Sequence, residues 1–256
     1  MRKKNRGQSL LEFAILVPLL VLFVMGAAEI TLFIGTYTNV IDLTREAARF
    51  ASVRDPSQNY TGTNCSADVN KSPPDPNNSF FYDTACIFSP LSGSDSCKTA
   101  DPTFCNGFNS TIFFKLNEDD ILVNVFTVTN NMVTAHYPSS DPFNLTIPVT
   151  PWVWSTSRAS HQENWKYNCD GTPIVPTPSA YFTVAKMDTY LGETPGTVQN
   201  KGFVTVEAYY CYHQVLKVPL IGLLFPDPMR IHVYTVMPLP AAAPADTPYP
   251  TDTPVP

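Results

Sequence analysis

The chain has 256 residues, of which 44% are hydrophobic, and it carries a formal net charge of −6. A chain of this length can form one ordinary domain with a hydrophobic core, and its many aromatic residues argue against a wholly disordered protein. The acidic balance argues against nucleic acid as a partner.

A long apolar stretch follows a short basic leader. The leader, residues 1–7, carries four basic residues and ends at Gly7, and the only charged residue from Phe13 to Ile41 is Glu29. A helix over this stretch is about 43 Å long at ~1.5 Å per residue, whereas the hydrocarbon core of a bilayer is ~30 Å thick. The stretch therefore predicts one membrane span. By the positive-inside rule, the leader lies in the cytoplasm and the body outside.

The helical pattern continues beyond the apolar stretch. In residues 42–53, DLTREAARFASV, Leu43, Ala47 and Ala51 recur at helical spacing between charged residues, and Pro56 marks a stop. We predict one helix over residues 8–54, half in the bilayer and half standing above it, with a bend at Pro18.

A cleaved secretory signal peptide is an alternative interpretation of the apolar stretch. Such peptides end in small residues, and MGAA at residues 25–28 is a candidate. The helical pattern runs straight through these residues, which favours a retained helix.

The residues around Gly7 form a more specific pattern. The leader ends in Gly7, and Gln8 and three further residues precede Glu12, Phe13 and the apolar helix. This pattern resembles the class III signal of type IV pilins. The resemblance implies that a prepilin peptidase cuts after Gly7, that Gln8 becomes the new N-terminus, and that Glu12 helps to recruit the subunit into a filament.

The chain resembles TadE-like proteins of the tight-adherence (Tad) pilus machinery more closely. The matching pieces are RGQSLLEFA at residues 6–14, Pro18, the second acid Glu29, and TREAAR at residues 44–49. The resemblance implies a pilin-like minor subunit whose partners are a prepilin peptidase, other pilin and minor-pilin subunits, the Tad secretion machinery and membrane lipid. The body is longer and richer in cysteine than is usual in that family.

Two interpretations of Glu12 remain open. A carboxylate in hydrocarbon is unfavourable unless it is paired, and cleavage after Gly7 would create an amine that a neighbouring, axially shifted helix could bring level with Glu12. Such pairing would favour one stagger of subunits. Alternatively, Glu12 lies solvated among lipid headgroups and does not determine the stagger of subunits.

Glu29 also has two interpretations. It lies roughly 24 Å along the helix from Phe13, near the outer edge of the hydrocarbon. It is either a functional membrane-embedded acid that acts in assembly or an acid that extends outward to headgroups or water. Gly26, Ala27 and Ala28 beside it form a small-residue patch suited to close helix packing.

The body outside the membrane, residues 55–237, begins with an irregular region and continues with strands. Residues 55–111 are rich in Pro, Ser, Asn and Asp, whereas β-strands are expected at 120–129, 202–218 and 229–237. An apolar loop at 219–228 faces the membrane, a partner subunit or its own core. We predict an α+β fold in which an antiparallel sheet packs on the half of the long helix outside the membrane. A proline-rich tail, residues 238–256, is expected to be disordered.

The cysteines are candidates for disulfides because the body is expected outside the cytoplasm. None lies in a CxxC pair, and buried thiols are the alternative. The six are Cys65, Cys86, Cys97, Cys105, Cys169 and Cys211.

No motif for catalysis, cofactor binding or metal binding stands out. The four histidines show no ligand spacing, and NEDD at residues 117–120 is typical of a turn before a strand rather than of a calcium site. No enzymatic activity is expected.

The sequence therefore favours a structural role, as a membrane-anchored minor subunit that acts in assembly, initiation or the tip of a Tad-type pilus in adhesion. A main filament subunit and a single-pass anchor that presents an adhesive module are the alternatives.

Overall fold

The computed structural model describes the long helix, the sheet and the segments packed against them. The described residues are 8–56, 79–88, 112, 115, 118–137, 154–155, 167–175, 178, 180–193, 196, 198, 201–217 and 226–239. The leader, most of the irregular region 55–111 and the proline-rich tail beyond Leu239 lie outside this set. The first two residues of the predicted disordered tail, Pro238 and Leu239, instead belong to a strand, where they pair with Phe203 and Gly202.

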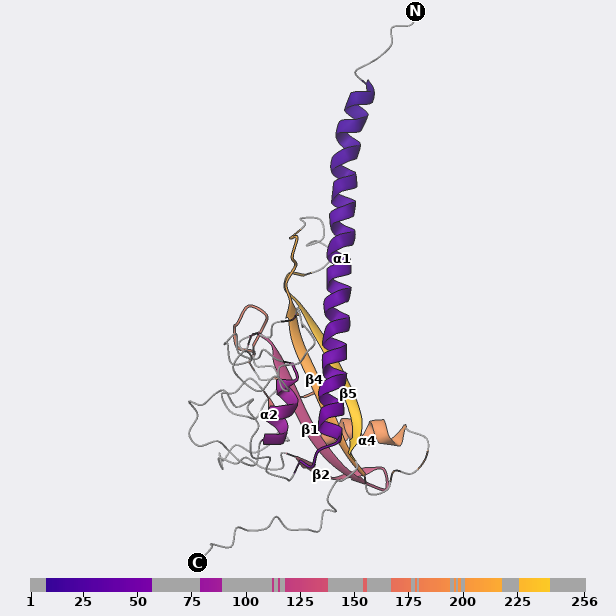
Figure 1. Cartoon of the computed structure of the whole chain (residues 1–256), viewed down its shortest axis with the longest axis vertical. Helices are drawn as coiled ribbons and strands as arrows, with labels where there is room; N and C mark the ends of the chain where they lie inside the picture. The colour runs from indigo at the N-terminus through magenta and orange to yellow at the C-terminus, as the bar shows by residue number, and fades with distance from the viewer. Residues whose placement is uncertain are drawn as a thin grey trace, which may run out of the picture.

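The helix α1 (Gln8–Ser52) runs through Pro18 without a break. Its N-terminal half stands clear of the body, and its C-terminal half lies along the sheet (Figure 1). The helix ends two residues before the predicted position. The N–H of Arg54 donates to the carbonyl of Ala51 at 3.0 Å, which closes a last turn just before Pro56.

The body is built on one antiparallel sheet, which confirms the predicted α+β fold. The strands are β1 (Asp120–Thr129), β2 (Met132–Tyr137), β3 (Trp154–Ser155), β4 (Lys201–Tyr212) and β5 (Met229–Leu239). Their order is β2-β1-β4-β5, and the short β3 also pairs with β1.

The three predicted strands correspond to β1, β4 and β5. The bounds of β1 agree with the prediction, β5 extends two residues further, and β4 ends six residues earlier, at Tyr212. The chain leaves the sheet after Tyr212 and turns toward α1. There the amides of Val215 and Leu216 donate hydrogen bonds to Glu29 instead of to a neighbouring strand. The predicted apolar loop lies mostly outside the described residues.

The sequence analysis did not predict β2. It follows β1 through a tight turn in which Asn130 and Asn131 adopt positive φ values of 53° and 60°. Asparagine tolerates this conformation better than most residues, and a two-residue hairpin turn with both central residues at positive φ requires it.

One face of the sheet packs against the C-terminal half of α1. Alternate residues of β1 and β4 point to this face, among them Val123, Val125, Val204 and Val206. From α1, small and branched side chains at helical spacing complete the same core, and all of them are buried: Val40, Leu43, Ala47, Ala48 and Ala51. The helix α2 (Ser79–Cys86) adds Phe80 and Phe81 to this core.

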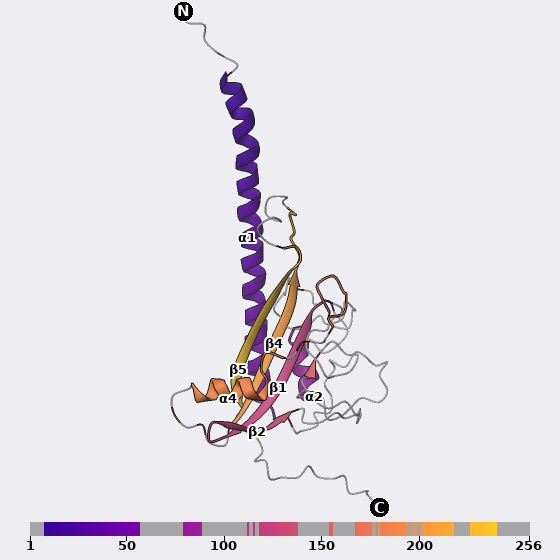
Figure 2. The same cartoon turned by 180° about the vertical axis from the view of Figure 1, so that it is seen from behind.

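The opposite face of the sheet carries a smaller core. The helix α4 (Val184–Gly192) crosses it and buries Met187 and Leu191 against Phe126 (Figure 2). The helix begins at Thr183, whose hydroxyl accepts a hydrogen bond from the N–H of Lys186. Helices on both faces fix the sheet in place along α1.

Candidate membrane-anchoring and assembly site

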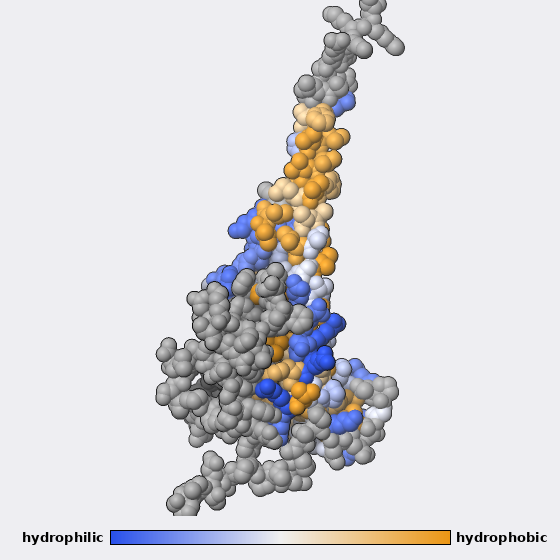
Figure 3. Space-filling view, viewed as in Figure 1, coloured by the Kyte–Doolittle hydropathy of each residue, from blue (hydrophilic) through white to orange (hydrophobic). Residues whose placement is uncertain are grey.

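The N-terminal half of α1 exposes an apolar surface. Phe13 is 68% exposed, and large aliphatic and aromatic side chains stay exposed as far as Ile34. This surface forms the hydrophobic part of the helix beyond the body (Figure 3). In the described part of the chain, α1 is the one helix that is long and apolar enough to cross a membrane. The structure therefore fits a single N-terminal membrane anchor.

The processing and assembly residues of the sequence analysis lie at the far end of this helix. Gly7 is outside the described residues, and Gln8 is the first residue of α1. Glu12 and Phe13 follow within the next two turns, and both side chains are exposed on the helix surface. They lie far from the body, so a contact that involves them in an assembly would be made within the exposed apolar half of α1.

Glu29 lies at the junction between the exposed and the packed halves of α1. Its side chain is only 3% exposed, so it does not extend to headgroups or water. The Tyr212 hydroxyl donates to its Oε1 at 2.6 Å, and the Val215 N–H donates to the same oxygen at 2.9 Å. The Leu216 N–H donates to Oε2 at 2.7 Å.

These three donors compensate for burial of the carboxylate. A buried acid is unfavourable unless its oxygens accept hydrogen bonds, and here both oxygens do. No lysine or arginine takes part in these bonds. Burial, together with the nearby Glu29 carboxylate, raises the pKa of Tyr212 above its ordinary value. The phenol of Tyr212 therefore stays a neutral donor at neutral pH.

The Glu29 contacts join α1 to the end of the sheet that lies nearest the exposed apolar half of the helix. Tyr212 is the last residue of β4, and its ring packs edge-on against Phe33 with the centroids 5.3 Å apart. Because Glu29 binds both the strand end and the turn that follows, it fixes the height along α1 at which the body begins. We call this set of contacts, Glu29 with Tyr212, Val215 and Leu216, the Glu29 clamp.

The sequence singled out Glu29 but not its partners. Tyr212 could be placed on the same face as Val204 and Val206 from the strand alternation, which the structure confirms. The donors at Val215 and Leu216 belong to the backbone, and no side-chain pattern signals them.

A second polar network holds the start of β1 against the end of β4. Asp119 accepts hydrogen bonds from the N–H of Cys211 at 2.6 Å and the N–H of Lys115 at 2.7 Å. Burial, the largest influence, raises the pKa of Asp119 to about 6. Beside it, Glu118 contacts His213 at 2.9 Å and Lys115 at 3.1 Å. Glu118 and Asp119 of the NEDD segment thus connect the start of β1 to the end of β4.

One pair of the candidate cysteines is bonded. Cys169 and Cys211 form a disulfide with their Cα atoms 5.5 Å apart, which ties the segment 167–175 to β4. The other four, Cys65, Cys86, Cys97 and Cys105, lie outside the described residues or have side chains that are not described. Their pairing stays a prediction.

Taken by its fold, this is a protein with one N-terminal helix suited to a membrane and an α+β body that docks on the other half of the same helix. Residues 7–49 match the family model of TadE-like protein. The match agrees with the resemblance that the sequence motifs predicted, over a segment that comprises Gly7 and most of α1. No curated protein and no solved structure matches the chain.

Proposed function

We propose that this chain is a membrane-anchored, pilin-like minor subunit that acts in the assembly, initiation or tip of a Tad-type pilus. The TadE-like match indicates a protein associated with the Tad pilus. The single observation that supports the role of a pilin-like subunit is the division of α1 into an exposed apolar half and a half packed into the body. A helix divided in this way can anchor a subunit in a membrane and can also be withdrawn into a filament.

The proposed partners follow from that role. A prepilin peptidase would cut after Gly7, and the new N-terminus at Gln8 would face the cytoplasm while the body lies outside. Other pilin and minor-pilin subunits, the Tad secretion machinery and membrane lipid would contact the exposed half of α1. The role is structural rather than catalytic and is related to adhesion.

Mass spectrometry of the N-terminus of the native protein tests this proposal. A mature chain that starts at Gln8 is expected, and a chain cut near residue 28 would instead be a secreted body. A chain that keeps its basic leader in a cell that has an active prepilin peptidase would contradict the proposal. That result would favour the second candidate, a single-pass anchor that presents a binding module.

Abundance in purified fibres separates a minor subunit from a main one. A minor subunit is expected at a small fraction of the major pilin, and a chain that forms the bulk of the fibre would be the main filament subunit. The size of the body favours the minor role.

A further inference from the structure

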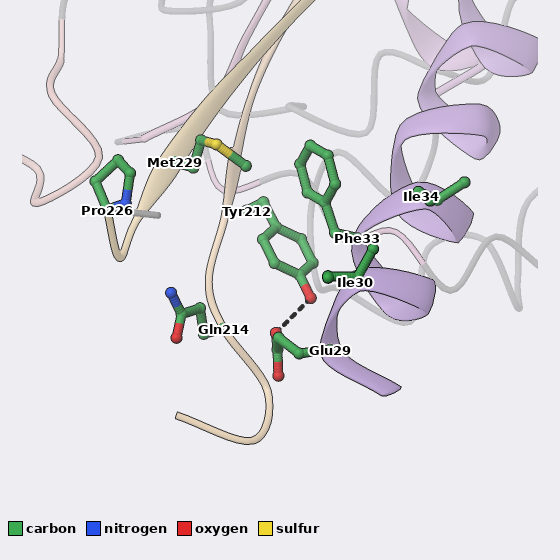
Figure 4. Close-up of a pocket in the computed structure, with 8 residues that line it drawn as sticks. All are labelled: Glu29, Ile30, Phe33, Ile34, Tyr212, Gln214, Pro226 and Met229. Carbon is green, nitrogen blue, oxygen red and sulfur yellow. Dashed lines mark hydrogen bonds between the residues drawn. The ribbon is translucent and has the colours of Figure 1, made fainter. Parts of the chain in front are cut away.

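An apolar cleft lies between α1 and the membrane-proximal end of the sheet. It has a volume of about 230 Å³. One wall is formed by Ile30 and Ile34 of α1 and the other by Pro226 and Met229, while Phe33 and Tyr212 lie between them (Figure 4). The cleft is therefore bounded by the two parts of the molecule that the Glu29 clamp joins.

The lining offers almost no polar group to a ligand. Most of its surface comes from aliphatic and aromatic side chains. The Tyr212 hydroxyl is already bonded to Glu29, and the carboxylate of Glu29 has three donors of its own. Gln214, which also lines the cleft, has a partner within the protein. A sugar, an ion or a polar peptide would leave its own polar groups without partners here, whereas a hydrocarbon chain would not.

The cleft is continuous with the apolar surface of the span. Ile34 is 54% exposed, and Ile30 lies one turn before it on the same exposed surface of α1. If the hydrocarbon core begins at Phe13, its thickness of ~30 Å corresponds to about 20 helical residues and ends near Phe33. The cleft thus opens at the outer edge of the hydrocarbon, where lipid acyl chains are already present.

A helix of a second copy would fit the cleft less closely than a flexible chain does. Because a helix is about 10 Å wide with its side chains, it would enter the cleft only with single side chains. A slender chain of methylene groups can instead follow the space between α1 and the sheet with part of its length, without moving the sheet away from α1.

We propose that the cleft binds one acyl chain of a phospholipid from the leaflet on the side of the body. This inference rests on the proposed membrane anchoring of α1. The bound chain would fill the space beside Tyr212 and seal the membrane-proximal end of the sheet, so that the body is held at the membrane surface by lipid as well as by the Glu29 clamp.

Three methionines of the chain allow a direct test. Met229 lines the cleft, Met25 lies on the span and is 37% exposed, and Met132 lies on β2 at the far end of the body and is 62% exposed. The full chain is produced with a diazirine analogue of methionine and reconstituted into vesicles of phosphatidylethanolamine and phosphatidylglycerol. After illumination, the adducts at each methionine are identified by peptide mass spectrometry.

The proposal expects phospholipid adducts at Met25 and Met229 and none at Met132. Lipid at Met25 but not at Met229 would overturn the cleft assignment and leave the membrane anchor intact. An adduct at Met229 with a second copy, or with another part of the same chain, would identify a different occupant and also overturn it. An absence of lipid at Met25 would instead contradict the membrane anchoring itself.

Filling the cleft from the helix side provides a matched control. Ile34→Trp and Ile30→Trp each place a larger side chain in the opening, and Leu20→Trp makes a comparable change on the exposed span. Either filling variant is expected to lower the lipid adducts at Met229 about tenfold relative to those at Met25, which corresponds to the loss of roughly two buried methylenes. Leu20→Trp should leave that ratio unchanged.

Protection of the β4 amides from hydrogen exchange, at the level of the unmodified protein, shows that each variant has folded. If both filling variants fold and neither changes the ratio, the lipid at Met229 comes from the bulk bilayer, and the proposed site is wrong.

Discussion

The hydroxyl of Tyr212 donates a 2.6 Å hydrogen bond to the carboxylate of Glu29, across a sequence separation of 183 residues. This bond joins the membrane-proximal end of β4 to the point at which α1 leaves the body. Glu29, an acid within an apolar helix, is therefore the polar contact that positions the body on α1.

Replacement of Glu29 by glutamine should weaken this connection. The amide group would place an N–H donor opposite the N–H of Val215 or Leu216, which leaves one bond unmade and costs roughly 1.5–3 kcal/mol. Hydrogen exchange at the Val215 and Leu216 amides should accelerate about tenfold or more. Tyr212→Phe should have a smaller effect because both backbone donors keep their acceptor.

Glu46→Gln is the matched control for this experiment. It makes the same chemical change on the same helix, at a residue outside the clamp. Equal exchange rates at Val215 and Leu216 in Glu29→Gln and in the unmodified protein would show that the clamp does not hold this turn.

Replacement of Glu12 by alanine should impair incorporation into a filament without loss of membrane insertion. An interchain pair between Glu12 and a neighbouring N-terminal amine, worth roughly 1.5 kcal/mol, would lower incorporation about tenfold when it is lost. The measurement is the ratio of subunit in purified fibres to subunit in membranes. Glu12→Asp keeps the charge and should retain most of the incorporation, and normal incorporation of Glu12→Ala would argue for the solvated interpretation.

Asp119 should make the stability of the body depend on pH. Its pKa is raised from 3.8 to about 6, chiefly by burial, so the folded protein binds a proton more tightly than the unfolded chain does. Between about pH 4 and pH 6 the contribution of this group to stability therefore falls as the pH rises, by about 2–3 kcal/mol in total.

Asp119→Asn isolates that contribution, since the amide does not titrate. The difference in the free energy of unfolding between the original chain and this variant, measured by urea denaturation, should shift in favour of the original as the pH falls from 7 to 4. A difference that is constant over this range would contradict the raised pKa.

The close packing of α1 on the sheet should not tolerate a larger side chain. Ala47 is fully buried in the core between α1 and the sheet. Ala47→Leu is therefore expected to destabilise the body by about 1–3 kcal/mol in urea denaturation. Ala28→Leu adds the same atoms at an exposed position of the span and should leave the stability of the body nearly unchanged.

Several elements could be predicted because their signals are local. The periodicity of residues 8–54 and the β-branched runs at 120–129 and 229–237 gave α1, β1 and β5 to within two residues. Two further local signals were present but were not used: the Asn130–Asn131 pair between β1 and β2, and Thr183 as the N-cap of α4. Each favours a turn or a helix start through its own conformational preference.

The clamp and the cleft could not be predicted in this way. The clamp requires that Tyr212 reach Glu29, and the cleft requires that Met229 lie across from α1. Both depend on the height at which the sheet docks on α1. By itself, the sequence determined an apolar helix with a basic leader, an acid at Glu29 and a set of strands, because periodicity and charge are properties of neighbouring residues. Only the tertiary structure decided that Glu29 faces inward, because its three donors come from residues about 185 positions away and converge on it only after the sheet has packed on the helix.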